Sequence, residues 1–374
     1  MKILFLCFAP VHKMHFTDMY ITDLGRQFDY EIWDISMLGG GEDKVNDEYP
    51  DIPRIHSRTE FSDRIAAVRK SDPKIIVISN ILIYNLHLIY DVLHKEGIPV
   101  IQIDKESIIY WMRDQYLLQH PDEIPDKEKS KYFWTSNPLT RKVYRYLEYQ
   151  HVKFDYMLGA RNYFPESSRQ FVHIHNLKYD EYLNSTKAEP VLPYKYILFM
   201  DAGLAHLPSV SGKENSIDRA DYLKHMNKLF KKIEDQCGLP VVIAAHPKSE
   251  YPSDPFEGRQ VILYKTAPLA QYAELVLVHY STAIVDLVLQ RKPIVFMYSK
   301  DYMQSASRTI LITTIEYAKL LNAPLIDIRG EYEIAGSVDE KAYDLFIKDN
   351  IINFKEKDKM NAELISNFIK SIVD

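Results

Sequence analysis

Short apolar runs alternate with longer amphipathic stretches through the first half of the chain. The runs are rich in β-branched and aromatic residues, which is typical of strands that are buried on both faces. They cover residues 3–8, 30–33, 75–78, 100–103, 154–158 and 171–174. The stretches between them, such as residues 58–70 and 83–95, have the apolar spacing of helices. This order predicts a mostly parallel sheet that is covered by helices on both faces.

The alternation stops at residues 178–193 and then starts again. This segment is polar and contains Tyr, Asn and Pro, so it predicts a connection between two domains. Beyond it, a long helix is expected at residues 218–236, ended by Gly238 and Pro240. Further strand-like runs occupy residues 196–200, 240–245, 261–264, 275–278, 293–297 and 325–328. The predicted fold class is therefore α/β, with two successive Rossmann-like domains.

A last helix is expected at residues 357–372. Its apolar residues recur at helical spacing and form one face, made of Leu364, Ile365, Phe368 and Ile372. We expect this helix to fold back across the domain junction. The sequence thus predicts an N-terminal domain at residues 1–188, a C-terminal domain at 189–355 and a C-terminal helix at 356–374.

Composition narrows the classes of function. The 374 residues are enough for two domains of ordinary size, and 52 acidic against 46 basic residues give no sign of a nucleic-acid partner. Cys7 and Cys237 show no metal-ligand spacing, which favours a reduced, cytoplasmic setting without structural zinc. No run reaches the roughly 20 apolar residues that span a bilayer, so any membrane contact is expected to be peripheral, on the inner face.

Two polar segments follow strand-like runs of the second domain. They contain His246, Pro247 and Lys248 after the run at 241–245, and His279, Ser281 and Thr282 after the run at 275–278. Ligands of parallel α/β sheets bind outside the carboxyl ends of the strands, so both segments are expected at one pocket. A helix that begins at Ser281 or Thr282 would offer free N–H groups to a phosphate. The pattern therefore predicts a diphosphate site.

Three residues of this predicted donor site have less defined roles. Asp201 and Gly203 follow the run at 196–200, although an aspartate there is equally suited to capping a turn. His279 is equally suited to packing and to donor contact. No pair of carboxylates stands at a strand end where it would hold Mg²⁺ against a diphosphate, so metal-independent chemistry without a cofactor is expected.

The stretch from residues 242–248 through 266–269 to 274–293 resembles bacterial surface-polysaccharide enzymes. These are the sialyl- and Kdo-type glycosyltransferases with HP and ST motifs and, more distantly, the polyglycerolphosphate transferases of teichoic acid synthesis. The resemblance implies the GT-B architecture, in which two Rossmann-like domains face a cleft. It also implies that His246, Ser281 and Thr282 contact the donor phosphates.

The same resemblance implies the reaction. The teichoic acid enzymes usually have Asp-Tyr-Ser-Ser where this chain has His279-Tyr280-Ser281-Thr282, which favours sugar transfer over glycerol phosphate transfer. The implied activity is metal-independent transfer of a sugar from a nucleotide donor to a glycan or glycolipid acceptor. The product would belong to a capsule, a lipopolysaccharide or another surface glycan. A CMP-activated acidic sugar is the preferred donor, with UDP and GDP sugars left open.

The N-terminal domain is expected to bind the acceptor and to supply a general base. His15 ranks first because it stands at the start of an expected helix at residues 16–28, where the helix dipole favours a neutral imidazole. Asp104, which follows the run at 100–103, ranks second. Three other functions stay open at this point. They are a CDP-polyol phosphotransferase, a non-hydrolysing nucleotide-sugar epimerase and a non-catalytic nucleotide-binding protein.

Overall fold

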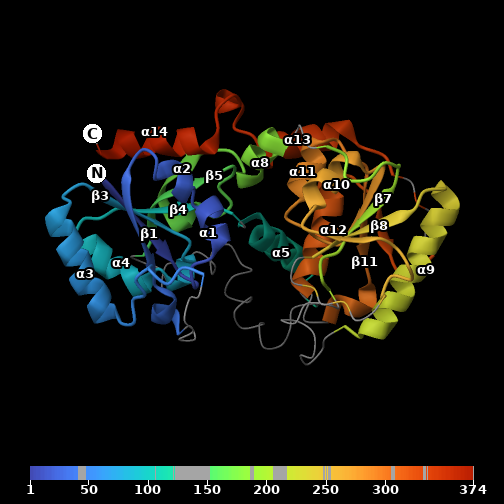
Figure 1. The fold of residues 1–374 in the computed structure, drawn as a ribbon, viewed down its shortest axis with the longest axis horizontal. Helices are drawn as coiled ribbons and strands as arrows, with labels where there is room; N and C mark the ends of the chain where they lie inside the picture. Colours follow the sequence, from blue (N-terminus) through green and yellow to red (C-terminus); the bar gives the residue numbers. More distant parts are fainter. Residues whose placement is uncertain are drawn as a thin grey trace. The chain divides into compact units, whose positions relative to one another are not determined.

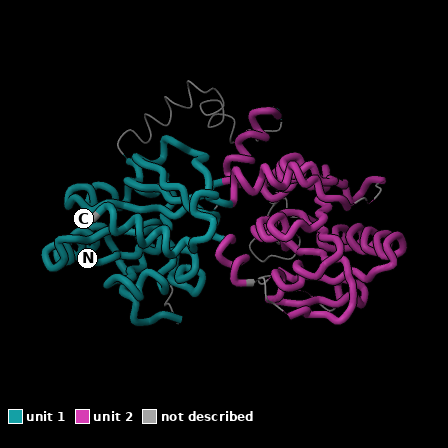
Figure 2. The backbone as a smooth tube through the Cα atoms, turned by 90° about the horizontal axis from the view of Figure 1, so that it is seen from above, with its two compact units in different colours: residues 1–107, 121–177, 352–374 teal, residues 108–120, 178–351 magenta. Residues whose placement is uncertain are grey.

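The computed structural model describes residues 1–40, 48–105, 107–120, 122, 152–185, 189–204, 217–246, 249, 251, 254–304, 308–331, 334 and 336–373. The chain forms two compact units (Figure 2). Unit 1 comprises residues 1–107, 121–177 and 352–374, and unit 2 comprises residues 108–120 and 178–351. Within the described residues, each unit contains a six-stranded sheet in which every pairing is parallel. The predicted α/β fold with two Rossmann-like domains is confirmed.

The sheet of unit 1 has the strand order β2-β1-β3-β4-β5-β6. Its strands are β1 (Lys2–Cys7), β2 (Asp29–Asp34), β3 (Ile75–Ser79), β4 (Val100–Ile103), β5 (Phe154–Gly159) and β6 (Ser168–His173). Successive side chains of a strand point to opposite faces, so β1 contributes Leu4 and Leu6 to one core and Ile3 and Phe5 to the other. The predicted apolar runs form strands because they supply both cores.

The helices of unit 1 lie on both faces of this sheet (Figure 1). The first core is covered by α3 (Arg58–Ser71) and α4 (His87–Lys95). The second is covered by α2 (Ile21–Leu24) and α14 (Asn361–Val373), which are more than three hundred residues apart in the chain. The predicted apolar face of the last helix, with Ile365 and Phe368, packs into this second core. The C-terminal helix therefore returns to the N-terminal unit, as predicted.

The sheet of unit 2 has the strand order β12-β11-β10-β7-β8-β9. Its strands are β7 (Ile197–Met200), β8 (Val241–Ala245), β9 (Val261–Leu263), β10 (Leu275–Val278), β11 (Ile294–Tyr298) and β12 (Leu325–Asp327). Its helices are α5 (Ser107–Gln119), α8 (Leu177–Ser185), α9 (Arg219–Cys237), α10 (Thr266–Tyr272), α11 (Ile284–Leu289), α12 (Arg308–Leu320) and α13 (Glu340–Asn350). Helix α9 begins after Asp218, whose carboxylate accepts from the backbone N–H of Asp221, and ends at Gly238 (φ +66°).

Helix α5 precedes β5 in the chain but belongs to unit 2. The ammonium of Lys319 on α12 lies 5.6 Å from the centre of the Tyr116 ring on α5, a cation–π contact within this unit. None of the helices in the described part of the chain is both long enough and apolar enough to cross a membrane.

Candidate functional site

The carboxyl ends of β8, β7 and β10 lie next to one another at one edge of the sheet of unit 2. Strand β7 pairs with β8 on one side and with β10 on the other, and all three run in the same direction. Asp201, His246 and His279 are the first residues after these strands. The fold therefore brings the strand-end residues predicted from the sequence to one edge, the usual place for ligands of such sheets.

Asp201 joins the turn after β7 to the loop after β8. Its side chain is buried, and Oδ1 accepts from the backbone N–H of Gly203 at 2.8 Å. Gly203 has a positive φ of +70°, a conformation that glycine adopts without strain. Oδ2 accepts from the hydroxyl of Tyr251 and, at 3.4 Å, from that of Ser249. Asp201 therefore both closes its own turn and fixes the neighbouring loop.

Tyr251 and Ser249 are site residues that the sequence did not indicate. Burial and the Asp201 charge raise the pKa of Tyr251, so its hydroxyl stays protonated and donates. The same hydroxyl interacts with the backbone of His246. The carbonyl of His246 also accepts from the backbone N–H of Ser249 at 2.9 Å. These contacts place the half-buried His246 beside the Asp201 turn, whereas Pro247 and Lys248 lie outside the described residues.

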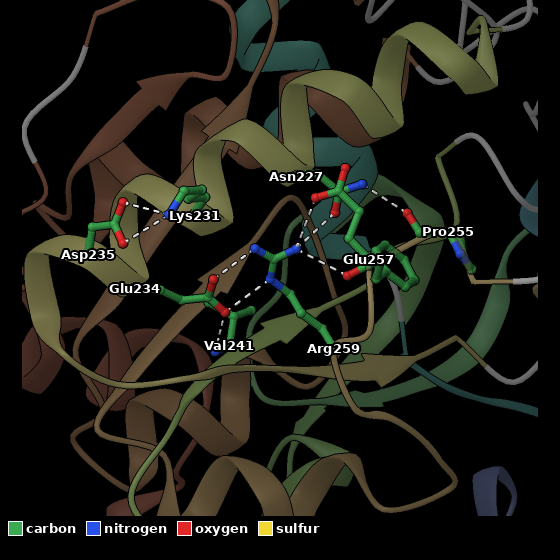
Figure 3. A network of polar contacts seen from close by, with 9 residues as sticks. Asn227, Lys231, Glu234, Asp235, Val241, Pro255, Glu257 and Arg259 are labelled. Carbon is green, nitrogen blue, oxygen red and sulfur yellow. Dashed lines mark hydrogen bonds and ion pairs between the residues drawn. The ribbon is translucent and has the colours of Figure 1, made fainter.

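The far end of this loop is anchored by Arg259 (Figure 3). The guanidinium makes a fork of two hydrogen bonds to Glu234 of α9, with Nε–Oε1 at 3.0 Å and Nη2–Oε2 at 2.7 Å. It also donates to the side-chain oxygen of Asn227 at 3.2 Å. Glu234 in turn accepts from the backbone N–H of Val241, the first residue of β8. This network ties the end of the loop that precedes β9, and the start of β8, to helix α9.

His279 is completely buried and uses both ring nitrogens inside unit 2. Nδ1 donates to the carbonyl of Met297 at 2.6 Å, and Nε2 accepts from the hydroxyl of Tyr222 at 3.0 Å. Burial lowers the pKa of His279 to about 4, so the ring is neutral near pH 7. The residue joins β10, β11 and α9 and thereby holds the start of the segment that contains Ser281 and Thr282.

The helix after β10 begins later than expected. Helix α11 starts at Ile284, not at Ser281 or Thr282. Ser281 closes the preceding turn, because its hydroxyl accepts from the N–H of Ala283 at 3.2 Å and its carbonyl accepts from that of Ile284 at 3.1 Å. The expectation that these N–H groups are free was therefore wrong for two of them. The side chain of Thr282 is exposed and that of Ser281 is half-buried.

Asp286 is a buried carboxyl of unit 2 that the sequence did not indicate. It is buried on α11, and burial raises the pKa of its carboxyl to about 7, opposed by the nearby charge of Lys178 on α8. Lys178 itself pairs with Glu181 at 2.6 Å. A carboxylate inside the otherwise apolar run 283–289 was the available sequence signal.

His15 lies at the carboxyl edge of the sheet of unit 1. The helix expected at residues 16–28 is broken into α1 (Lys13–Asp18) and α2, with Tyr20 at a positive φ of +54° between them. His15 is thus inside α1 and 3% exposed, and its Nδ1 accepts from the backbone N–H of His12 at 3.1 Å. Burial, followed by the neighbouring His12, lowers the pKa of His15 to about 4. His15 is the third residue of α1, so it does stand in the first turn of a helix, and burial is the largest cause of its neutral imidazole.

Asp104, the other predicted catalytic residue, follows β4 at the same edge of unit 1. Its Oδ1 accepts from the backbone N–H of Ser107 at 3.0 Å, at the beginning of α5. The next residue, Lys105, forms an ion pair with Asp18 of α1, with Nζ–Oδ2 at 2.6 Å. This ion pair joins the loop of Asp104 to the helix of His15.

Among the residues that the structure describes, no three His, Cys, Asp or Glu side chains are arranged to hold a metal ion.

Comparison with known proteins assigns the fold. No protein-family model and no curated protein sequence matches the chain. Among solved structures, a UDP-GlcNAc 2-epimerase from Methanocaldococcus jannaschii is similar over 99% of this chain and 100% of its own, with 12% identity and a TM-score of 0.51. Os79 from O. sativa in complex with UDP is similar over 98% of this chain and 94% of its own, with 11% identity and a TM-score of 0.49. S. aureus MnaA with UDP is similar over 100% of this chain and 97% of its own, with 12% identity and a TM-score of 0.48. The chain has the GT-B fold.

Proposed function

We propose that this protein is an enzyme that binds a nucleotide-activated sugar and transfers the sugar to a glycan or glycolipid acceptor. The observation that carries the proposal is the shared strand-end edge of unit 2 in a GT-B fold. There, His246 follows β8 and Ser281 and Thr282 follow β10, on either side of β7. Hydroxyl and imidazole groups fixed at one edge suit the diphosphate of a nucleotide sugar.

In this proposal, unit 2 binds the donor. His246 and the hydroxyls of Ser281 and Thr282 contact the phosphates, with Pro247 and Lys248 completing the segment after β8. Negative charge grows on the departing phosphate during transfer, and preorganised donors stabilise such charge strongly. Asp201 and Gly203 shape the adjoining turn, and His279 holds the β10 end through Met297 and Tyr222.

Unit 1 binds the acceptor, and His15 and Asp104 act there on the reacting groups. We propose a metal-independent reaction with a CMP-activated acidic sugar as the preferred donor, since the HP and ST segments most resemble enzymes that use such donors. The product is a surface glycan made at the cytoplasmic side, with peripheral contact to the membrane. UDP sugars are the first alternative donors.

The second candidate is a nucleotide-sugar epimerase. It is favoured by the likeness to the UDP-GlcNAc 2-epimerase of Methanocaldococcus jannaschii, which has a TM-score of 0.51. An epimerase converts its nucleotide sugar without an acceptor, whereas a transferase yields a glycosylated product. A CDP-polyol phosphotransferase would use the same strand ends with CDP-glycerol or CDP-ribitol.

Thermal-shift measurements with CMP, CDP, UDP and GDP separate these proposals. A ligand that binds only the folded protein raises its melting temperature by mass action, by an amount that depends on affinity. Stabilisation by CMP supports the CMP-sugar donor, stabilisation by UDP or GDP alone overturns that preference, and no shift with any nucleotide contradicts the proposal as a whole. Mass spectrometry of donor incubations with and without acceptor then distinguishes transfer from epimerisation.

A further inference from the structure

We propose that His15 acts on the substrate as a neutral hydrogen-bond donor through its Nε2–H, and that the backbone of His12 is the group that sets this tautomer. The inference rests on the proposed function, because it assigns a role within that same site. It gives His15 and Asp104 different roles, because Asp104 is then the proton-accepting group of unit 1.

The contact between His12 and His15 fixes the position of the ring proton. The backbone N–H of His12 lies 3.1 Å from Nδ1 of His15. A backbone N–H can only donate, so Nδ1 must carry a lone pair. A neutral imidazole has one N–H group, which must therefore be on Nε2. The opposite ring orientation would direct a C–H group at the N–H of His12 and lose this hydrogen bond.

The surroundings of His15 keep the ring neutral. The side chain is 3% exposed, and the ring of His12 lies with its centre 4.0 Å from that of His15. Both features oppose a positive charge on His15 and lower its pKa to about 4, against the opposite influence of Asp18. Near pH 7, His15 is then neither a charged acid nor a base with an open lone pair. What the ring offers is the Nε2–H group.

That N–H group makes no hydrogen bond to any of the residues that the structure describes, where His15 bonds through Nδ1. A nearly buried donor without a protein partner is suited to a ligand oxygen. Neutral imidazole donors serve in this way at other catalytic sites, where they polarise an oxygen that gains negative charge. The class of ligand group is therefore an oxygen of the bound substrate that carries or gains negative charge.

Asp104 lies in a loop that is tied to the helix of His15. The ion pair between Lys105 and Asp18 fixes the loop that begins with Asp104 against helix α1. A carboxylate accepts a proton from an acceptor hydroxyl, whereas a neutral Nε2–H does not. Unit 1 therefore supplies two different groups at one edge, a carboxylate for the proton and an N–H group for the oxygen.

The tautomer can be measured without any substrate. We expect ¹⁵N-detected ring spectra of the full-length, histidine-labelled protein to show His15 as the neutral Nε2–H form from pH 5.5 to 8. The His15 signals are assigned by their loss in His15→Gln. His12→Ala is the matched control, because it keeps the backbone N–H and should keep the tautomer. An Nδ1–H form, a charged ring at pH 7, or a tautomer change in His12→Ala would overturn the inference.

Turnover of the His15 variants tests the role. A glutamine amide can place an N–H near the Nε2 position, whereas asparagine and alanine cannot. With UDP-N-acetylglucosamine and CMP-N-acetylneuraminate as donors, His15→Gln should keep at least about one tenth of the turnover. His15→Asn and His15→Ala should lose about 10²- to 10³-fold. A folded His15→Gln as inactive as His15→Ala would contradict the donor role. If the unmodified protein turns over neither donor, the proposed function fails, and the ring spectra still decide the tautomer.

Discussion

Asn361 and His175 are joined by hydrogen bonds in both directions. The backbone N–H of His175 donates to Oδ1 of Asn361 at 2.8 Å, and Nδ2 of Asn361 donates to the carbonyl of His175 at 3.2 Å. The same amide donates to the hydroxyl of Tyr20 at 3.1 Å. Both residues are completely buried, so the side chain of Asn361 replaces a backbone partner for the segment after β6 and fixes the beginning of α14.

The first prediction concerns this contact. Asn361→Ala leaves the N–H and the carbonyl of His175 buried without their partner, and each such group costs about 1–3 kcal/mol. We expect the free energy of unfolding to fall by about 2–3 kcal/mol, measured by urea denaturation. Ser371→Ala, on the exposed side of the same helix, is the control and should change it by no more than about 0.5 kcal/mol. Equal stability of the two variants would show that Asn361 does not anchor the helix.

The second prediction concerns acid stability. The pKa of His279 is lowered to about 4 by burial, whereas the unfolded chain has a pKa near 6.5. Between these values the unfolded state binds a proton that the folded state does not, so stability falls as the pH decreases from about 6.5 to 4. His279 contributes about 3 kcal/mol of this dependence. We expect His279→Phe to flatten the curve of unfolding free energy against pH. His56→Gln, an exposed histidine, should leave its slope unchanged.

The third prediction concerns Asp286, whose effect on stability changes with pH in the opposite direction. Burial raises the pKa of Asp286 to about 7, above its unfolded value of 3.8. Its contribution is therefore fully present below pH 3.8 and is lost as the pH rises to about 7. We expect Asp286→Asn to be more stable than the unmodified protein at pH 8 and to lose that advantage at pH 4. Urea denaturation at the two pH values measures this, with exposed Asp235→Asn as the control. An equal change at both pH values would contradict it.

The fourth prediction uses two ion pairs on α9 (Figure 3). Arg259 is largely buried in its fork with Glu234, whereas Lys231 and Asp235 are both exposed. Lys at position 259 keeps the charge but cannot make the fork. We expect Arg259→Lys to lower the unfolding free energy by about 1–3 kcal/mol and to raise the KM for the donor by loosening the loop of Tyr251. Lys231→Ala should change neither, because exposed pairs contribute about 0–1 kcal/mol. Unchanged donor KM in Arg259→Lys would separate this network from the site.

The strands were predictable because a strand that is buried on both faces consists of consecutive apolar residues. Residues 241–245 and 275–278 form β8 and β10, and the polar residues that follow them reach one edge because parallel strands share a direction. The contacts that complete the site leave no such pattern in the sequence. Asp201 and Tyr251 are fifty positions apart, and their hydrogen bond depends on the path of the intervening loop.

Two local features were missed for related reasons. Tyr20 adopts a positive φ, which sequence rules assign to glycine or asparagine, so the break between α1 and α2 was not expected. Helix α5 joins unit 2 through contacts such as that between Tyr116 and Lys319, which are distant in sequence. In both cases tertiary contacts decide what the local pattern leaves open.

The last prediction concerns the proposed phosphate contacts. The side chain of His246 is half-buried at a strand end, while its backbone makes the contacts to Ser249 and Tyr251. His246→Ala should therefore stay folded and lose a donor to the developing oxyanion, which costs roughly 3–4 kcal/mol, or about 10² to 10³ in rate. Thr282→Ala should reduce the rate less, because water can take the place of an exposed hydroxyl. Ser281→Ala should also loosen the turn before α11, since its hydroxyl accepts from the N–H of Ala283. Rates at saturating acceptor with varied donor measure these effects, with circular dichroism as the folding control. A folded His246→Ala protein with unchanged donor kinetics would remove His246 from the donor site.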